Sequence, residues 1–588
     1  MLDSPLIDYP LSYTRRVTRT ISVKNIKIGS QHPVVIQSML TSHTTDSLHC
    51  LAQIKALTKA NCQLIRLSLL HQKDLAAMPE LLRLLSNEGI AVPLVADVHF
   101  AANLAIGACE FFDKIRINPG NFSDRPKNYR QQIDKKYDFE IGKIKLKERI
   151  KPLAEKLNYY KRALRIGVNH GSLSERMMQR YGDSPLAMVE SALEMAQIFS
   201  EYGVTDIVIS LKSSNPLIVQ KAYRLFAKRN FGKSALPLHL GVTEAGSDTI
   251  GRVKSLCGIG SLLADGIGDT IRVSLTEDSV NEVVFAEGLR TYITTNYRHP
   301  KQGMQAANSS ANPITYQGLL DEYRKEHKAY QLGNIELGNK SSLKIGVVAG
   351  KTQFLSKKTT LDFNYELSAN KLYLISDKRK IEANFISQNE YMHTKGSIKN
   401  HNNAPICFSD ELSIFKIRQL YQQEVINKVS IGLFVSSARG KQDYSLEIKL
   451  ASLIGEGLLD FILLSDQFTA ADGHRLLDVL QATRARLIET DYVACPSCGR
   501  TMFDLPAVTK LIKSKTNHLK GVKIGILGCM VNGPGEMADA DFGYVGSSAG
   551  KIDLYLGHRR VKKNIPTERA LIELIDLIKL SGKWVEPN

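Results

Sequence analysis

Residues 92–119 read VPLVADVHFAANLAIGACEFFDKIRINP, and they contain two apolar runs that flank one helical stretch. The runs PLVADVH (93–99) and KIRINP (114–119) have the length and the Val/Ile content of buried strands. The segment between them, 101–112, has helical spacing. A strand, a crossing helix and a second parallel strand form a right-handed βαβ unit. The stretch therefore predicts an α/β fold built on a parallel sheet.

The same alternation extends in both directions, from residue 33 to about residue 293. Six further strand candidates bring the total to eight; they lie at 33–39, 64–69, 164–170, 206–212, 238–244 and 270–275. Helical stretches such as 185–203 and 216–229 separate them. Eight βα units in roughly 260 residues predict a (β/α)₈ TIM-type barrel. A doubly wound open sheet is the alternative, but the glycine-rich phosphate loop that usually follows its first strand is missing.

Polar side chains occur at the C-terminal ends of these strands and recur two residues apart. The pairs are Arg66 and Ser68, Asp97 and His99, Arg116 and Asn118, Ser210 and Lys212, and Arg272 and Ser274, with Arg165 and Asn169 four apart. Side chains spaced by two or four residues share one face of a strand. Charged groups are costly to desolvate against packed helices, so we expect them in the barrel mouth, where active sites of this fold lie.

Five of these strands bring a cation to the same rim: Arg66, Arg116, Arg165, Lys212 and Arg272. Guanidinium groups match phosphate oxygens in a bidentate manner. Each cation could instead pair with a local carboxylate, but Asp97 and Glu244 are the rim acids that the sequence offers, and two acids cannot neutralise five cations. We therefore expect a ligand with more than one phosphate charge. His99, next to Asp97 on the strand, is either a satisfied rim residue or a catalyst.

Three of the eight cysteines form a pattern near the C-terminus. DYVACPSCGR places Cys495 and Cys498 in a C-x-x-C motif, and KIGILGCMVNGPGE places Cys529 at the end of an apolar strand. This arrangement is typical of zinc or iron–sulfur ligands. A redox disulfide between the first two would leave Cys529 unexplained. We interpret the five other cysteines, scattered in apolar contexts, as small core residues.

A fourth ligand is required, and Glu536 is the candidate. It follows Asn532-Gly533-Pro534-Gly535, a run that permits tight turns and can bring the carboxylate back toward the metal. Three thiolates and one weaker oxygen ligand would leave one iron open to substrate, whereas structural zinc sites prefer four soft or imidazole ligands.

The overall composition excludes several classes of protein. The 588 residues are too many for one core, and eight cysteines are too few for a disulfide scaffold. No apolar run is long enough to span a membrane, and no secretory signal is visible, so we expect a soluble, reduced, cytoplasmic protein.

The net charge of the chain is +18. The stretch 125–162 carries 13 Lys/Arg against 5 Asp/Glu, and we interpret its segment 143–162 as an amphipathic helix with a solvated basic face. Ile144, Leu146, Ile150, Leu153 and Leu157 are expected partly inward, and no nucleic-acid-binding motif is recognisable.

We expect three domains: a barrel at 1–298, a central α/β insert at 299–485 and a small α/β cluster domain at 486–588. The polar linker 296–316 marks the first boundary. Strand-like runs in the insert lie at 342–350, 371–377, 404–409, 429–437 and 459–466, with helical runs at 410–426 and 445–459. An incomplete second barrel fits this pattern. The insert lacks convergent polar strand ends, which favours a structural spacer over a partner-docking role. In the last domain, 522–528 and 551–557 are strand-like and 568–580 is an amphipathic helix.

Eight motifs in order resemble one family, the 4-hydroxy-3-methylbut-2-enyl diphosphate synthases, which are iron–sulfur enzymes of the methylerythritol phosphate route to isoprenoids. The matching segments are QSMLTSHTTD, VPLVADVHF, RINPGN, RIGVNHGSL, LHLGVTEAG, GIGDTIRVSL, ACPSC and GCMVNGPGE. They cover about residues 15–295 and 487–588. The intervening span resembles the large-insert, three-domain form of the family.

The resemblance implies a two-electron reductive ring opening of 2-C-methyl-D-erythritol 2,4-cyclodiphosphate with loss of water. It also implies a [4Fe–4S] cluster held by Cys495, Cys498, Cys529 and Glu536, with flavodoxin or ferredoxin as electron donor. The implied substrate contacts are Arg66, Asp97, His99, Arg116, Asn118, Arg165, Asn169, Lys212, Thr243, Glu244, Arg272, Ser274 and Asn532. Glu244, His99 and Glu536 are the candidate catalytic acids, with Glu244 favoured. A homodimer is expected, and the insert favours closure of barrel and cluster domain within one chain.

Two other functions are open to test. A phosphosugar lyase barrel with a structural zinc tail would turn over its substrate without a reductant. An iron–sulfur regulator that binds RNA through the basic helix 143–162 would show steeply salt-dependent RNA binding.

Overall fold

The computed structural model describes residues 13–99, 101–122, 139–246, 248–297, 330–332, 335–337, 343–348, 362–368, 371–376, 379–386, 405–421, 430–436, 443–496, 498–530 and 540–587. Internal contacts divide the chain into two units. One comprises Arg15–Thr291 and Glu489–Asn588, and the other comprises Met1–Thr14 and Tyr292–Ile488.

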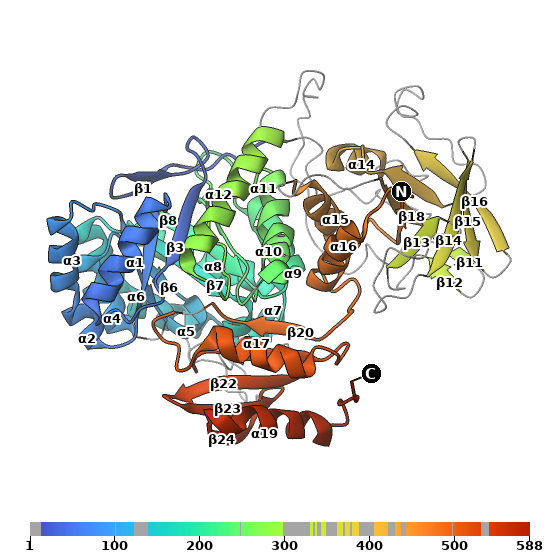
Figure 1. The fold of residues 1–588 in the computed structure, drawn as a ribbon. Coiled ribbons are helices and arrows are strands. Elements are labelled where there is room, and N and C mark those ends of the chain that lie inside the picture. Colours follow the sequence, from blue (N-terminus) through green and yellow to red (C-terminus); the bar gives the residue numbers. More distant parts are fainter. Residues whose placement is uncertain are drawn as a thin grey trace. The chain divides into compact units, whose positions relative to one another are not determined.

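The first unit contains the expected barrel of eight parallel strands (Figure 1). The strands are β3 (Val35–Met39), β4 (Leu64–Leu69), β5 (Leu94–Val98), β6 (Lys114–Ile117), β7 (Ala163–Asn169), β8 (Ile207–Lys212), β9 (His239–Leu240) and β10 (Thr270–Ile271). Hydrogen-bonded neighbours run in the order β8-β7-β6-β5-β4-β3-β10-β9. A parallel bridge between Ile209 and Leu238 joins the two ends. The predicted fold class is confirmed, and every predicted strand overlaps an observed one.

Helices follow the strands and begin at recognisable capping residues. The side chains of Asp46, Ser184 and Asn215 accept backbone N–H bonds at the starts of α1 (Ser47–Lys59), α8 (Pro185–Glu201) and α9 (Pro216–Arg229). Pro185 and Pro216 occupy first-turn positions of α8 and α9, where a missing N–H costs nothing. The helices of this barrel are α1 (Ser47–Lys59), α2 (Gln72–Ala76), α3 (Met78–Asn87), α4 (Ala102–Phe111), α5 (Pro119–Phe122), α6 (Phe139–Tyr160), η1 (His170–Ser172), α7 (Glu175–Tyr181), α8 (Pro185–Glu201), α9 (Pro216–Arg229), α10 (Asp248–Ser255), η2 (Leu256–Gly260), α11 (Ser261–Ala264) and α12 (Ser279–Asn296).

The N-terminal end of the barrel is closed by a hairpin of β1 (Ile21–Val23) and β2 (Ile26–Ile28). Apolar residues of the hairpin pack against the first inward-facing residues of five strands. The buried cluster comprises Ile21, Val23, Ile28, Val35, Leu64, Val95, Ala163 and Val208. Because this end is apolar and plugged, the polar strand ends face an opening at the opposite, C-terminal end.

The same unit includes a five-stranded C-terminal sheet. Its strands are β20 (Asp491–Ala494), β21 (Lys523–Leu527), β22 (Phe542–Ser548), β23 (Lys551–Leu556) and β24 (Arg559–Pro566), in that order, with helices α17 (Leu505–Thr516) and α19 (Thr567–Leu580). An isolated parallel bridge pairs Ala245, after β9, with Ala494. Lys254 Nζ also donates to Asp491 Oδ1 at 3.2 Å and to the Tyr492 carbonyl at 3.0 Å. The sheet is therefore docked at the end of the barrel where the strands finish.

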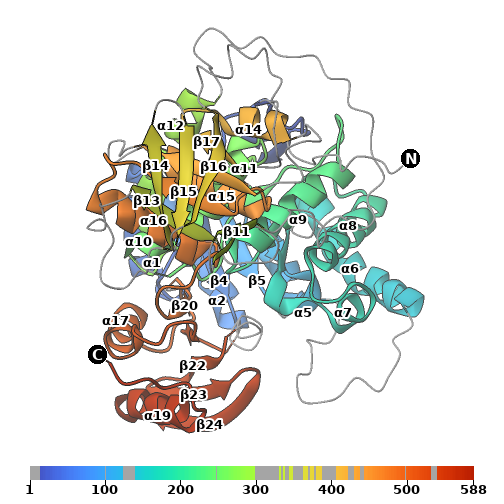
Figure 2. The same cartoon turned by 90° about the vertical axis from the view of Figure 1, so that its right-hand side faces the viewer.

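The second unit contains a closed barrel of seven strands, several of which lie side by side in Figure 2. The strands are β13 (Lys344–Val348), β14 (Phe363–Ser368), β15 (Lys371–Ser376), β16 (Arg379–Ile386), β17 (Ile406–Ser409), β18 (Ile431–Val435) and β19 (Phe461–Leu464). This unit also has β11 (Tyr330–Leu332), β12 (Ile335–Leu337), α14 (Ile414–Tyr421), α15 (Ser445–Gly455) and α16 (Ala470–Ala482). The expectation of an incomplete barrel was wrong, because β14 and β16, which sequence reasoning missed, complete the ring.

The basic segment 143–162 lies largely in α6, whose buried face comprises Leu146, Ile150, Leu153, Ala154 and Leu157. Ile144, expected partly inward, is 58% exposed. Among the described helices, none combines the length and apolar character that a membrane crossing requires.

Candidate functional site

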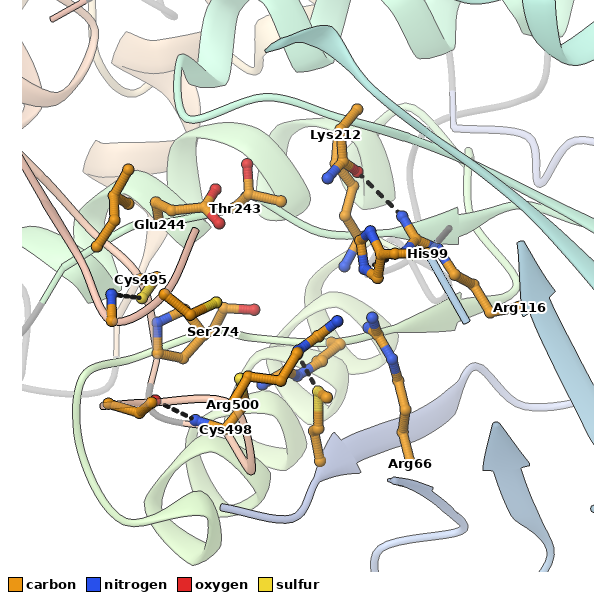
Figure 3. A pocket seen from close by; sticks show the side chains of 18 of the residues that line it. Arg66, His99, Arg116, Lys212, Thr243, Glu244, Ser274, Cys495, Cys498 and Arg500 are labelled. Carbon is orange, nitrogen blue, oxygen red and sulfur yellow. Dashed lines mark hydrogen bonds between the residues drawn. The ribbon is translucent and has the colours of Figure 1, made fainter. Parts of the chain in front are cut away.

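The C-terminal ends of the barrel strands and the cysteine loops line one cavity (Figure 3). Ten of the proposed substrate-binding residues line it: Arg66, His99, Arg116, Arg165, Asn169, Lys212, Thr243, Glu244, Arg272 and Ser274. Cys495, Cys498 and Cys529 line the same cavity. The five rim cations therefore converge, and the three thiols face them.

Asp97 lies fully buried beneath the cationic wall and organises it. Its Oδ2 accepts from Arg66 Nη2 at 2.5 Å and its Oδ1 from Arg116 Nη1 at 3.0 Å. Burial by itself would raise the pKa of this carboxyl, but Arg66, His99, Arg116 and Arg500 outweigh it and hold the pKa well below its ordinary value. Asp97 is therefore an ionised anchor for the arginines.

His99 stands beside this pair in contact with Arg116. Its Nε2 lies 2.5 Å from Arg116 Nη1 and 3.3 Å from Asp97 Oδ2. Burial, and then the charge of Arg116, lower the pKa of His99 to about 3. A neutral imidazole at this position orients Arg116 and offers no proton from an imidazolium.

Arg165 and Lys212 are cations in a strongly positive environment. Burial, then Arg165 and Arg272, lower the pKa of Lys212 well below its ordinary value. Burial, then Arg66 and Arg116, do the same to the pKa of Arg165. In the described structure, the Nε and Nη1 atoms of Arg165 are buried without a hydrogen-bond partner. An anionic ligand would reduce the repulsion among these cations and accept hydrogen bonds from the unpartnered N–H groups of Arg165.

Glycines make room for these long side chains on neighbouring strands. A Cβ on Gly167 would lie 2.5 Å from Arg116 Nε, and one on Gly241 would lie 2.8 Å from Lys212 Nζ. Gly167 lies on β7 and Gly241 directly follows β9, and both face the barrel interior. A larger residue at either position would displace the side chain of Arg116 or Lys212 from the cationic wall.

A rim carboxylate was missing from the sequence-based set. Glu282, on α12, is buried and places Oε2 3.5 Å from Arg272 Nε; it also accepts from Ser38 Oγ at 2.9 Å. Burial raises the pKa of Glu282, and Arg272 opposes that effect. The expectation that Asp97 and Glu244 are the only rim acids was therefore wrong. No strand-end pattern could reveal Glu282, because it reaches the rim from a helix.

Asn118 and Asp97 do not line the cavity itself. Asn118 Nδ2 donates to Ser172 Oγ at 2.7 Å, and its Oδ1 accepts from the Gly120 N–H at 3.2 Å. In this arrangement Asn118 shapes the turn after β6.

Glu244 occupies the side of the cavity nearest the thiols. It is buried and adopts a left-handed backbone conformation with φ of 49°. Such conformations are costly for a residue other than glycine and cluster at functional sites. Its negative charge contributes to the raised pKa of Cys495. The next residue, Ala245, forms a parallel bridge with Ala494. Glu244 thus lies between the anion pocket and the C-x-x-C loop.

The three thiols have the donor chemistry and the setting that a cluster requires. Burial raises the pKa of Cys495 well above its ordinary value, and the neighbouring Cys498 and Cys529 add to that effect. The Gly528 N–H donates to Cys495 Sγ at 3.2 Å. All eight cysteines are free thiols. Three mutually close thiols without a disulfide fit an iron–sulfur cluster, which neutralises their combined charge.

In the part of the chain that the structure describes, no group of three His, Cys, Asp or Glu side chains is arranged to hold a single metal ion. A cluster distributes its ligands over several irons, so a wider arrangement of thiols is compatible with it. The other two proposed residues of this site, Glu536 and Asn532, lie outside the described residues.

The remaining cysteines behave as core residues. Cys50, Cys62 and Cys109 are buried, and burial raises the pKa of each to about 12. Cys407 is buried as well, and its pKa is raised for the same reason. Their thiols are therefore protonated and inert at neutral pH.

Arg500 is a functional candidate that sequence reasoning did not single out. It lines the cavity from the cysteine loop, and its Nη2 donates to Asp97 Oδ2 at 2.7 Å. The sequence did offer one signal for this residue: Arg500 stands two residues after Cys498, in a motif already assigned to ligand binding.

Comparison with known proteins agrees with this architecture. Residues 18–287 match the family model described as the GcpE TIM-barrel domain, and residues 491–580 match the GcpE protein C-terminal domain. Three curated relatives carry the name 4-hydroxy-3-methylbut-2-en-1-yl diphosphate synthase (flavodoxin). The chain is 40% identical to the one from Akkermansia muciniphila, covering 98% of this chain and 99% of the relative. It is 36% identical to that of Leptospira interrogans, covering 98% of each, and 35% identical to that of Chlorobaculum tepidum, covering 100% and 92%.

Proposed function

The chain belongs to the GcpE family of 4-hydroxy-3-methylbut-2-en-1-yl diphosphate synthases, and from that premise we propose that it reduces 2-C-methyl-D-erythritol 2,4-cyclodiphosphate to 4-hydroxy-3-methylbut-2-enyl diphosphate. It is an iron–sulfur oxidoreductase of isoprenoid biosynthesis. The observation that carries the proposal is the single cavity in which five barrel cations face three thiols. The alternative of a redox-independent lyase with a zinc tail is not favoured.

The cationic wall would hold the cyclic diphosphate. Arg66, Arg116, Arg165, Lys212 and Arg272 supply charge and donors for the phosphate oxygens, and these groups also stabilise the diphosphate as a leaving group. We assign the remaining substrate contacts to His99, Asn169, Thr243, Glu244, Ser274 and Asn532. Asp97 and Asn118, which do not line the cavity, act indirectly: Asp97 fixes Arg66 and Arg116 in position, and Asn118 shapes the turn after β6.

Cys495, Cys498 and Cys529 would hold a [4Fe–4S] cluster, with Glu536 as the fourth ligand. When bound, the cluster supplies the two electrons of the reaction, one at a time. Cys529 is buried and Cys495 and Cys498 are half-buried in the cavity wall, so bound substrate would complete the exclusion of water from the region between them.

The reaction breaks the ring C–O bond to phosphate and one C–OH bond, and it forms a carbon–carbon double bond. Two electrons enter, and the hydroxyl takes up a proton and leaves as water. We assign that proton to the Glu244 carboxyl, which is buried between the anion pocket and the thiols. His99 and Glu536 are the other candidate catalytic groups; the neutral His99 acts here through its hydrogen bond to Arg116.

We further propose flavodoxin as the electron donor, as the relatives' names indicate, with ferredoxin as the alternative. Eight free thiols suit a reducing compartment, which supports a cytoplasmic location.

We also propose a homodimeric assembly and a division into three domains: a barrel at 1–298, an insert at 299–485 and a cluster domain at 486–588.

The test is anaerobic purification followed by an assay with the cyclodiphosphate. We expect brown protein with about four irons per chain, the content of one such cluster, and turnover that requires a reductant and is lost in air. Stoichiometric zinc without iron, or turnover without a reductant, would contradict the proposal and favour the lyase. A Cys529→Ser variant should lose the visible absorbance, while Cys407→Ser, a buried core cysteine of the second unit, should keep it.

A further inference from the structure

Arg500 joins the cysteine loop to the floor of the anion pocket. In Figure 3 it extends from the loop of Cys498 toward Arg66 and Arg116. Its guanidinium is almost fully buried, with 4% of the side chain exposed, and it donates to Asp97 Oδ2 at 2.7 Å. The loop is tightly folded, because the Thr501 N–H donates to the Cys498 carbonyl at 2.9 Å and the Cys498 N–H donates to Thr501 Oγ1 at 3.1 Å. The position of Arg500 is therefore fixed from both ends.

Arg500 also lies close to a proposed ligand. It follows Cys498 by two residues, lines the same cavity as the Cys498 thiol, and its positive charge opposes the effect of burial on the pKa of that thiol. One planar cation thus lies at the cluster site and bonds to the carboxylate that anchors the substrate arginines. Charge near the ligands is among the factors that set the potential of an iron–sulfur cluster.

Asp97 is shared by competing partners. Arg66 Nη2 and Arg500 Nη2 both reach Oδ2, at 2.5 and 2.7 Å, and Arg116 reaches Oδ1 at 3.0 Å. One carboxylate cannot balance three guanidinium groups. A diphosphate in the pocket would attract Arg66 and Arg116, and Asp97 would then bind Arg500 more strongly. That change alters the position and the effective charge of Arg500 beside Cys498.

We propose that Arg500 is a positioning residue that couples occupancy of the diphosphate pocket to the electronic state of the cluster site. The inference rests on the proposed function. By thermodynamic reciprocity, if substrate shifts the cluster potential, reduction of the cluster must change substrate affinity by the same free energy. Arg500 is the physical link through which the two sites communicate.

Docking of the C-terminal sheet does not depend on Arg500 alone. Lys254 is buried and bonds to Asp491 and Tyr492, and Thr276 Oγ1 donates to the Cys495 carbonyl at 3.3 Å. The Lys254 contact joins the same two parts of the unit but touches neither Asp97 nor a thiol. Lys254→Met is therefore a matched control that weakens docking while it leaves the proposed link in place.

The experiment is an anaerobic redox titration of the iron-loaded holoprotein, with and without the cyclodiphosphate, followed by the cluster's visible absorbance. In the wild type we expect a substrate-induced shift of the midpoint potential and a matching difference in substrate Kd between oxidised and reduced protein. In Arg500→Lys, which keeps the charge but loses the fork geometry, we expect the shift to vanish and the ratio of the two Kd values to fall to about one. Lys254→Met should retain both effects.

A full shift in Arg500→Lys, or an equal loss in Lys254→Met, would overturn the coupling role. If Arg500→Lys fails to load iron, Asp97→Asn provides the second test, because it removes the shared carboxylate without changing the cysteine loop; a preserved shift there would also overturn the inference. Failure of the wild type to turn over the cyclodiphosphate would instead overturn the proposed function itself.

Discussion

Asp97 shows how far strand spacing can predict a site at the scale of single residues. The pattern at 93–99 places Asp97 and His99 on one face of a strand, and the structure shows them in contact. The pattern could not show that this carboxylate binds three guanidinium groups, one of them from a loop about 400 residues later. Arg500 and Glu282 reach the rim from a loop and a helix, and period-two spacing carries no information about such residues.

The protonation of His99 provides a test at this scale. Burial lowers the pKa of His99 to about 3, so the ring stays neutral between about pH 5 and 8. The unfolded chain binds this proton more readily, so the free energy of unfolding falls as pH drops from about 6.5 toward 3. NMR of ¹⁵N-labelled imidazoles, with His99→Asn to assign the signal, should show no titration between pH 5 and 8. A midpoint of about 6.5, the ordinary value, would contradict the buried contact with Arg116.

At the scale of elements, the apolar runs predicted the first barrel because each strand is buried on both faces and flanked by helices. Strands that face solvent on one side gave weaker signals. β24 carries RRVKKNIP with largely exposed side chains, and β14 and β16 mix polar residues into the ring of the second barrel. These strands form because they pair with neighbouring strands, and a single sequence does not show that pairing.

The hairpin of β1 and β2 makes a prediction about stability. Ile28 is fully buried in the cluster that closes the N-terminal end of the barrel. Ile28→Ala should lower the free energy of unfolding by about 2–5 kcal/mol, as for other large-to-small changes in cores, while KM and iron content stay unchanged because the cavity lies at the opposite end. Urea unfolding measures the first effect.

The control for that experiment is Val17→Ala. Val17 lies in the same N-terminal segment but is 50% exposed, so its truncation should change stability little. An Ile28→Ala variant as stable as Val17→Ala would show that the hairpin does not plug the barrel.

At the scale of the whole molecule, function depends on parts that are far apart in sequence but belong to one compact unit. Residues 15–291 and 489–588 form that unit, although about 200 residues separate them along the chain. The motifs indicated both the anion pocket and the thiol site, and the net charge was uninformative about either. That the two share one cavity within a single chain follows from the docking of the C-terminal sheet, through Ala245, Lys254 and Arg500, on the barrel's open end.

The proximity of substrate and cluster can be measured directly by electron–nuclear double resonance on reduced, iron-loaded protein with ¹³C-labelled cyclodiphosphate. Because the cations and the thiols line the same cavity, we predict hyperfine coupling between substrate carbon and the cluster spin, and its loss in an Arg272→Ala variant at substrate concentrations that saturate only the wild type. Wild-type protein that binds both iron and labelled substrate yet shows no ¹³C coupling would contradict the account.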